Sequence, residues 1–236
     1  MGLVVLIIFG WYELRQTSPV FNMNLFRNKK FTSSNIAALC SYLAIMVVTT
    51  ILNYHFQYVR GWDAQMSGMI LIITPIIMAI MAPNAGKLSD KIHTQKLAAI
   101  GIGIAAIALA ILTFLNGDTP LYIVVLAMVL QGFGMGLFSS PNMNAIMSSV
   151  PPKDAPTASA SQATMRTIGQ TMSLGLLTLI FAWVMGSLKL APQYASMIVQ
   201  ASQTICLICT IACVLSVFAS LVGIKSSDKF NTDRPN

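Results

Sequence analysis

Residues 97–115 read LAAIGIGIAAIALAILTFL, and Thr113 is the most polar side chain in this stretch. A helix needs about 20 predominantly apolar residues to cross roughly 30 Å of hydrocarbon, because each residue rises about 1.5 Å. The stretch meets this length and carries no charge. It therefore predicts a membrane-spanning helix, and its uniform composition suits a position that faces lipid.

Five further stretches have a comparable length and composition, and strands are excluded because a barrel would show shorter segments of alternating polarity. Residues 1–11 are apolar but too short to span. We expect them to be the end of a helix whose beginning is missing, with an interfacial anchor as the alternative. The six predicted spans are residues 33–53, 65–83, 97–115, 119–139, 161–185 and 201–224.

The composition excludes a water-soluble globular protein. Of the 236 residues, 56% are hydrophobic and 9% are charged, whereas soluble domains carry about 25% charged residues. The net charge of +7 would suggest a nucleic-acid partner in a soluble protein. Here the basic residues lie mostly in loops between apolar runs, so we expect the lipid bilayer as partner and no nucleic acid.

The loop charges predict the orientation of the chain. Connections on one side hold twelve Lys and Arg residues, and the other side holds only Arg60 and Lys189. Basic loops stay in the cytoplasm, which predicts a multi-pass protein of the plasma membrane with both termini cytoplasmic. Residues 12–32 are then a cytoplasmic connector, 33–224 the six-helix transmembrane bundle and 225–236 a cytoplasmic tail. The twelve residues are Arg15, Arg27, Lys29, Lys30, Lys87, Lys91, Lys96, Lys153, Arg166, Lys225, Lys229 and Arg234.

Two spans carry polar side chains that need an explanation. Gln131 is expected to face the bundle interior, because a buried amide without a partner is costly. Gly132 and Gly136 lie four residues apart on one helix face, which favours close helix packing.

In the fifth span Gln162, Arg166, Gly169, Gln170 and Ser173 recur at helical spacing. They predict one polar stripe that faces water or protein. Arg166 at the bilayer centre would cost roughly 2.5–3.5 kcal/mol. The alternative is that it lies only one or two turns inside the span and extends to the cytoplasmic surface.

Catalytic and metal sites find no support in the sequence. The thiols of Cys206, Cys209 and Cys213 share one helix face, but no His, Asp or Glu lies nearby to complete a metal site. No HExxH or GxSxG motif and no pair of intramembrane carboxylates is present. We therefore expect no enzyme, no catalytic residue, no metal and no cofactor.

The loop at residues 86–96, GKLSDKIHTQK, resembles the G-x-L-a-D-r-x-G-r-r signature of the major facilitator superfamily. Gly86, Leu88, Asp90 and Lys91 match, and His93 replaces the second glycine. Residues 141–152 and 164–171 are similar to the late-helix region of the fourteen-helix drug:proton antiporters, although residues 155–156 read Ala-Pro where those usually have Arg-Gly. Residues 13–31 resemble their connector into the C-terminal helices.

The resemblance implies an all-α membrane fold, the C-terminal half of the major facilitator fold. It consists of two inverted three-helix repeats, with residues 1–11 as a partial helix, packed against an N-terminal six-helix half that is missing here. The first, second, fourth and fifth spans would line the cavity, and the third and sixth would be peripheral. The implied substrate path comprises Gln131, Asn142, Arg166, Gln170 and Ser173.

The implied function is proton-coupled export of drugs or other amphiphilic small molecules by alternating access, with the proton gradient as energy source and no cofactor. Gly86, Asp90 and Lys91 would form a gating loop, in which Asp90 contacts a helix N-terminus of the other half. The alternative is a stand-alone half-size membrane protein that dimerises or binds a partner without transporting.

Overall fold

A computed structural model describes residues 23–89, 91–186 and 190–232. Residues 1–11 and the first part of the 12–32 connector therefore lie outside the described residues, as does Asp90. The elements are η1 (Met23–Arg27), α2 (Lys29–Tyr54), η2 (His55–Val59), α3 (Ala64–Leu71), α4 (Ile73–Ser89), α5 (Thr94–Thr113), α6 (Leu121–Met147), η3 (Pro152–Asp154), α7 (Ala155–Met185), η4 (Pro192–Tyr194) and α8 (Ala195–Thr232).

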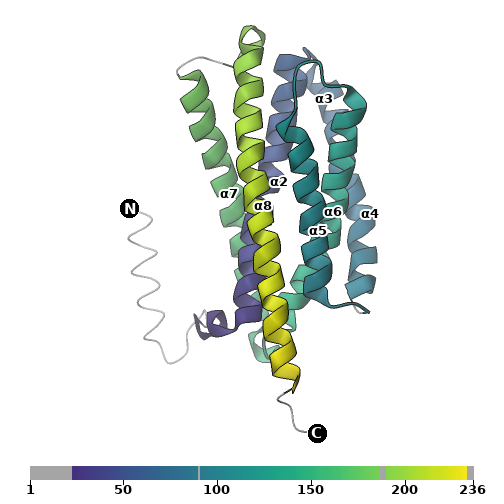
Figure 1. The fold of residues 1–236 in the computed structure, drawn as a ribbon, viewed down its shortest axis with the longest axis vertical. Helices are drawn as coiled ribbons and strands as arrows, with labels where there is room; N and C mark the ends of the chain where they lie inside the picture. Colours follow the sequence, from purple (N-terminus) through teal and green to yellow (C-terminus); the bar gives the residue numbers. More distant parts are fainter. Residues whose placement is uncertain (1–22, 90, 187–189, 233–236) are drawn as a thin grey trace.

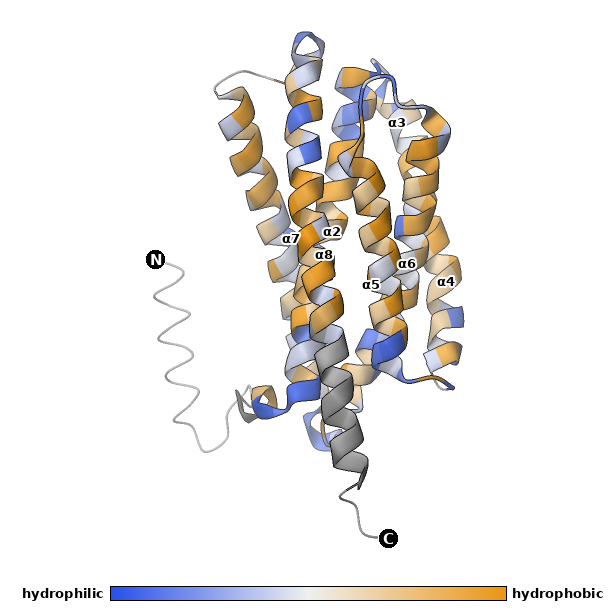
Figure 2. Cartoon of the chain, in the orientation of Figure 1, coloured by the Kyte–Doolittle hydropathy of each residue, from blue (hydrophilic) through white to orange (hydrophobic). Residues whose placement is uncertain are grey.

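The described residues form an all-helical bundle with six helices that are long and apolar enough to span a membrane. The long helices stand side by side (Figure 1). Apolar residues dominate their middle parts, and hydrophilic residues gather toward the two ends (Figure 2). The protein is therefore an integral membrane protein, as the sequence predicted. The spans are Lys29–Val59, Ala64–Ser89, Thr94–Thr113, Leu121–Met147, Pro152–Met185 and Pro192–Phe218.

Several helices extend beyond the predicted spans. α6 passes through Pro141 and ends at Met147 rather than at residue 139, and α7 begins at Ala155 rather than at residue 161. α8 continues to Thr232, so most of the predicted cytoplasmic tail is helical. The apolar runs that defined the predictions mark the part of each helix suited to hydrocarbon, not the ends of the helix itself.

The second span is interrupted between α3 and α4 at Ile72. Pro75 explains this position, because proline has no N–H to donate to the carbonyl of residue 71, four positions earlier, and its ring clashes there. Pro83, in contrast, lies inside the continuous helix α4.

The helices pack in an open arc, in the order α4, α6, α5, α8, α2 and α7. The first, second and third spans can be exchanged with the fourth, fifth and sixth, respectively. The neighbouring helices α2 and α7 then become α6 and α4, and the neighbours α2 and α8 become α6 and α5. The pair of α5 and α8 is unchanged. Because each repeat contains three spans, the second repeat starts from the opposite end of the bundle. This pairing is the one that two inverted three-helix repeats produce.

The third span, α5, differs from the expectation that it faces lipid. More than half of its apolar window, 56%, is buried, because α5 packs between α6 and α8. Its outer face carries Ile107 and Phe114, which are 57% and 78% exposed. Uniform apolarity could not separate these faces, because lipid and a neighbouring helix favour the same side chains.

Candidate functional site

The face of α6 that points to the bundle interior carries two buried amides. Gln131 is 1% exposed and Asn142 is 2% exposed, and they are eleven positions apart, about three turns, so both lie on one face. Both amide atoms of Gln131 and Nδ2 of Asn142 have no hydrogen-bond partner among the described residues. The expectation that Gln131 is interior is confirmed, and its hydrogen-bonding capacity is unused.

The neighbouring glycines of α6 contact α4, as their spacing predicted. A Cβ atom added to Gly132 would lie 2.5 Å from the carbonyl oxygen of Thr74, and one added to Gly136 would lie 2.7 Å from Cβ of Met81. Real Cβ atoms do not approach neighbours this closely, so the two helices touch only because these positions lack side chains.

The polar residues of α7 share one face of this continuous helix, as their spacing predicted, but they differ in burial. Gly169 and Ser173 are buried, whereas Arg166 is exposed and Gln170 is half-buried. A Cβ atom on Gly169 would lie 2.5 Å from the carbonyl oxygen of Leu39. Because glycine lets α2 approach here, the stripe is divided into a packed part and an open part.

Arg166 lines a hollow of about 200 Å³. It lies eleven residues after Ala155, where α7 begins, which places it about 16 Å along the helix. The start of α7 lies outside the predicted span, which begins at residue 161, so both interpretations of Arg166 stay predictions. The other lining residues are Tyr42, Ser159, Gln162 and Ala163.

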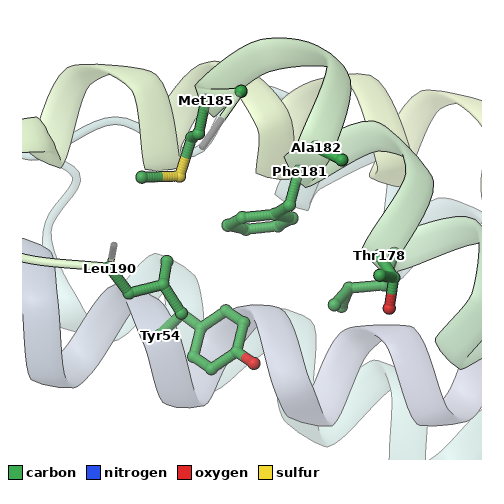
Figure 3. A pocket seen from close by; sticks show the side chains of 8 residues that line it. Tyr54, Thr178, Phe181, Ala182, Met185 and Leu190 are labelled. Atoms are coloured by element: carbon green, nitrogen blue, oxygen red, sulfur yellow. The ribbon is translucent and has the colours of Figure 1, made fainter. Parts of the chain in front are cut away.

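A second cavity lies between α2 and α7 near the opposite ends of these helices (Figure 3). It measures about 270 Å³. The rings of Tyr54 and Phe181 meet edge to face at 5.5 Å between centroids and 70° between planes, and Met185, Leu190 and the Thr178 side chain complete much of the wall. Such a mixture of apolar surface and few hydroxyls suits an amphiphilic molecule.

A buried hydrogen bond joins α2 to α7 below this cavity. Ser161 Oγ donates to Oδ1 of Asn35 at 3.1 Å, and Asn35 Nδ2 donates to the carbonyl of Phe31 at 3.0 Å. Sequence reasoning missed both this pair and the Tyr54–Phe181 cavity. Asn35 is a visible polar residue in an apolar run, but only knowledge that α2 pairs with α7 could identify its partner.

The start of the expected gating loop is attached to α6. Asn144 Nδ2 donates to Ser89 Oγ at 2.7 Å, and Ser89 Oγ donates to the carbonyl of Gly86 at 2.7 Å. Lys91 is exposed. Asp90 is not among the described residues, so its expected contact stays a prediction.

In the part of the chain that the structure describes, no group of His, Cys, Asp or Glu side chains is placed to hold a metal ion. Cys206, Cys209 and Cys213 are buried free thiols within the main core. They therefore act as small packing residues between the helices.

Comparisons with known proteins agree on one family. The Major Facilitator Superfamily model matches residues 3–174. The riboflavin transporter RibZ of Clostridioides difficile is 28% identical over 97% of this chain and 51% of its own length. The uncharacterized transporter YebQ of Escherichia coli is 31% identical over 75% of this chain and 40% of its own length. The multidrug resistance protein Stp of Mycobacterium tuberculosis is 26% identical over 77% and 34%.

The fold is also found among solved transporter structures. Tetrameric PepTSo2 superposes with a TM-score of 0.71 at 18% identity, covering 88% of this chain and 44% of that chain. A bacterial homologue of the human drug peptide transporters PepT1 and PepT2 gives 0.70 at 15% identity, covering 82% and 40%. At these identities the likeness concerns the fold alone. The chain spans about half the length, or less, of the relatives it matches.

Proposed function

Because the chain belongs to the major facilitator superfamily, we propose that it is the C-terminal half of a proton-coupled transporter that exports amphiphilic small molecules, including drugs. Its named relatives are transporters rather than enzymes. The similarity to a protein named for multidrug resistance supports the substrate class. The match to about half of each relative supports the assignment as one half of a larger transporter.

The observation that carries the proposal is the pair of hollows between α2 and α7. One is polar and contains Arg166, and the other is apolar and is walled by Tyr54 and Phe181. An amphiphilic molecule has both kinds of surface, and a pocket for it needs apolar walls with few fixed polar groups. The proposed path comprises Gln131, Asn142, Arg166, Gln170 and Ser173, with Tyr54 and Phe181 added from the structure.

The missing half would complete this path. α4 and α7 are the end helices of the arc, and only 6% and 33% of their apolar windows are buried. We assign the N-terminal six-helix half to this open side, in the plasma membrane, with the basic loops in the cytoplasm. The described carboxylates Asp63, Asp118 and Asp154 lie at helix starts or in loops, so the proposal places the membrane-embedded proton carriers in the other half.

The gating loop is proposed to act as a weak latch between the halves. Asp90 would contact a helix N-terminus of the opposite half, an interaction of about 0.3–1 kcal/mol, while the Asn144–Ser89 bond keeps the α4 end of the loop in place. In the complete transporter, Asp90→Asn should lower efflux without lowering membrane abundance. Unchanged efflux would reject the latch.

The main experiment measures export of ethidium, an amphiphilic cation, from efflux-deficient cells. The complete transporter should export it, Arg166→Gln in that transporter should slow export, and the 236-residue chain alone should equal an empty vector. Gly175→Ala is the matched control on the same helix, because nothing lies within 4 Å of the added Cβ. Export by the chain alone, or a stable homodimer of the purified chain, would favour a stand-alone half-size protein.

A second candidate substrate is a riboflavin-like heteroaromatic compound. The riboflavin transporter RibZ matches 97% of this chain, and the unpaired amides of Gln131 and Asn142 could donate to and accept from the polar edge of such a ring system. Transport of radiolabelled riboflavin by the complete transporter, lost in Gln131→Leu, would support it. Export of ethidium without riboflavin transport would reject it.

A further inference from the structure

The basic end of the bundle contains a corner where the start of α2 meets the connection between α6 and α7. Asn28 Nδ2 donates to the carbonyl of Ser149 at 2.8 Å. Its Oδ1 accepts from the backbone N–H of Lys30 at 3.0 Å, which caps α2. One side chain thus fixes the first turn of α2 against a connection more than a hundred residues later in the chain.

A small apolar cluster beneath these bonds makes the corner rigid. Leu25, Phe31, Ile146 and Ala158 are all buried and form a cluster separate from the main core. Phe26 packs its ring edge to face on Phe31, with 5.3 Å between centroids. The short helix η1, which carries Arg27, is therefore held across the end of the bundle (Figure 1).

The two segments that meet at this corner carry four basic residues. Arg27, Lys29 and Lys153 are exposed, and Lys30 is half-buried with its Nζ donating to Ser148 Oγ at 3.0 Å. The structure gives Arg27, Lys29 and Lys153 no ion pair with a described acid. Asp154, next to Lys153 in η3, is the one described acid of these two segments, so the corner keeps a net positive charge that an anion would balance.

One large apolar side chain is exposed on α2 below the cations. Ile36 follows Lys29 by seven residues, about two turns, so it lies on the same face of α2, and it is 48% exposed. A cation above exposed aliphatic surface at the end of a spanning helix matches the two parts of a phospholipid, whose phosphate lies at the interface and whose chains lie beneath it.

We propose that this corner, formed by Arg27, Lys29, Lys30 and Lys153, binds the phosphate headgroup of an anionic phospholipid, with its acyl chains along the Ile36 face of α2. The Asn28–Ser149 bond places the cations of the two segments around one headgroup. None of these four residues belongs to the proposed substrate path, and the site does not depend on what the protein transports.

The test measures retained lipid by native mass spectrometry of the purified chain, with phosphatidylglycerol and phosphatidylcholine offered in equal amounts. The triple variant Arg27→Gln, Lys29→Gln, Lys153→Gln removes three cations whose side chains make no hydrogen bond to the described residues. The matched control is Lys87→Gln, Lys91→Gln, Lys96→Gln, which removes the same charge beside the α4–α5 loop at the same end of the bundle (Figure 1).

The wild-type chain should retain phosphatidylglycerol in preference to phosphatidylcholine. The corner variant should lose this preference about tenfold or more, because each basic residue at an anionic surface contributes severalfold, and the control should stay within about twofold. Equal losses in both variants, or none in the corner variant, would overturn the site. Displacement of the lipid by millimolar inorganic phosphate would overturn the choice of lipid as the ligand.

Correct folding is checked by the elution profile and thermal stability of each variant. Should the triple variant not fold, Lys153→Gln alone and Lys96→Gln alone form the matched pair, since both residues are exposed. A lower phosphatidylglycerol preference only in Lys153→Gln would support the site. Equal preference in the two single variants would reject it.

Discussion

The two edge pairs of the arc, α2/α7 and α4/α6, occupy equivalent positions in the two repeats, and their backbones approach in the same way. Gly169 would place a Cβ atom 2.5 Å from the carbonyl oxygen of Leu39, and Gly132 would place one 2.5 Å from that of Thr74. Each edge helix therefore packs through a glycine contact of the same closeness. In α2/α7 the glycine lies on the edge helix, and in α4/α6 it lies on the inner one.

Their side chains differ. The α2/α7 pair contains the buried Asn35–Ser161 bond and is flanked by two hollows. The α4/α6 pair has a long bond from Thr74 Oγ1 to the carbonyl of Met128, 3.3 Å, and a polar contact only at its end. The repeat thus gives the two pairs the same close backbone approach, whereas the two hollows and the buried interhelical hydrogen bond occur at the α2/α7 pair. This is why we place the two hollows of the proposed substrate path at α2/α7, whereas its buried amides Gln131 and Asn142 lie on α6.

The largest effect is expected from Gly132→Leu and Gly169→Leu. Neither side chain can be accommodated without moving a backbone carbonyl, so each should destabilise the bundle by about 3 kcal/mol or more. Denaturation in detergent micelles measures this, and Gly175→Leu is the control, since its Cβ would meet nothing within 4 Å. Wild-type stability of Gly132→Leu with loss in Gly169→Leu would show that the two edges do not pack alike.

The next largest effect concerns hydration of the two edges. In a chain whose own cysteines are replaced by alanine, Arg166→Cys should react with a water-soluble maleimide at least about tenfold faster than Ile80→Cys. Ile80 is 58% exposed on α4, but a thiol facing hydrocarbon does not form the reactive thiolate. Comparable labelling rates would remove the distinction between a hydrated and an apolar edge.

Double-mutant cycles compare the polar contacts of the two edges. Asn35→Ala with Ser161→Ala should give a coupling of about 1 kcal/mol, within the range for interhelical bonds in membranes. Asn144→Ala with Ser89→Ala should give about half of this, because the Asn144–Ser89 bond is only partly buried. A larger coupling for Asn144–Ser89 would reverse the assignment of the more polar edge.

The smallest effect is expected from Thr74→Val. Its hydroxyl lies 3.3 Å from the Met128 carbonyl, so the loss should stay below about 0.5 kcal/mol. Thr178→Val is the control, since its hydroxyl donates within α7 to Leu174 at 2.8 Å. A cost above about 1 kcal/mol for Thr74→Val alone would mean that the α4/α6 edge depends on polar bonding after all.

Composition and run length were enough to predict the six spans and the packing role of Gly132 and Gly136, because both follow from local sequence. The start of α7 at Ala155 and the passage of α6 through Pro141 were missed, since helices extend past their apolar parts. The division of the α7 stripe at Gly169 depends on which face α2 covers. The packing of α2 on α7 is a tertiary contact, and residue spacing along one helix does not show which helix packs on which face.

One hydrogen bond links the ends of the fold, and it has a consequence for biosynthesis. Ser216 Oγ, on α8, donates to the carbonyl of Ala37, on α2, at 3.2 Å across 179 positions of sequence. During translation α2 leaves the ribosome long before α7 and α8 exist, so Asn35 and Ser41 enter the bilayer without their eventual neighbours. A nascent chain arrested before α7 would hold both groups in lipid without these interhelical partners, which makes it a substrate for membrane quality-control proteases.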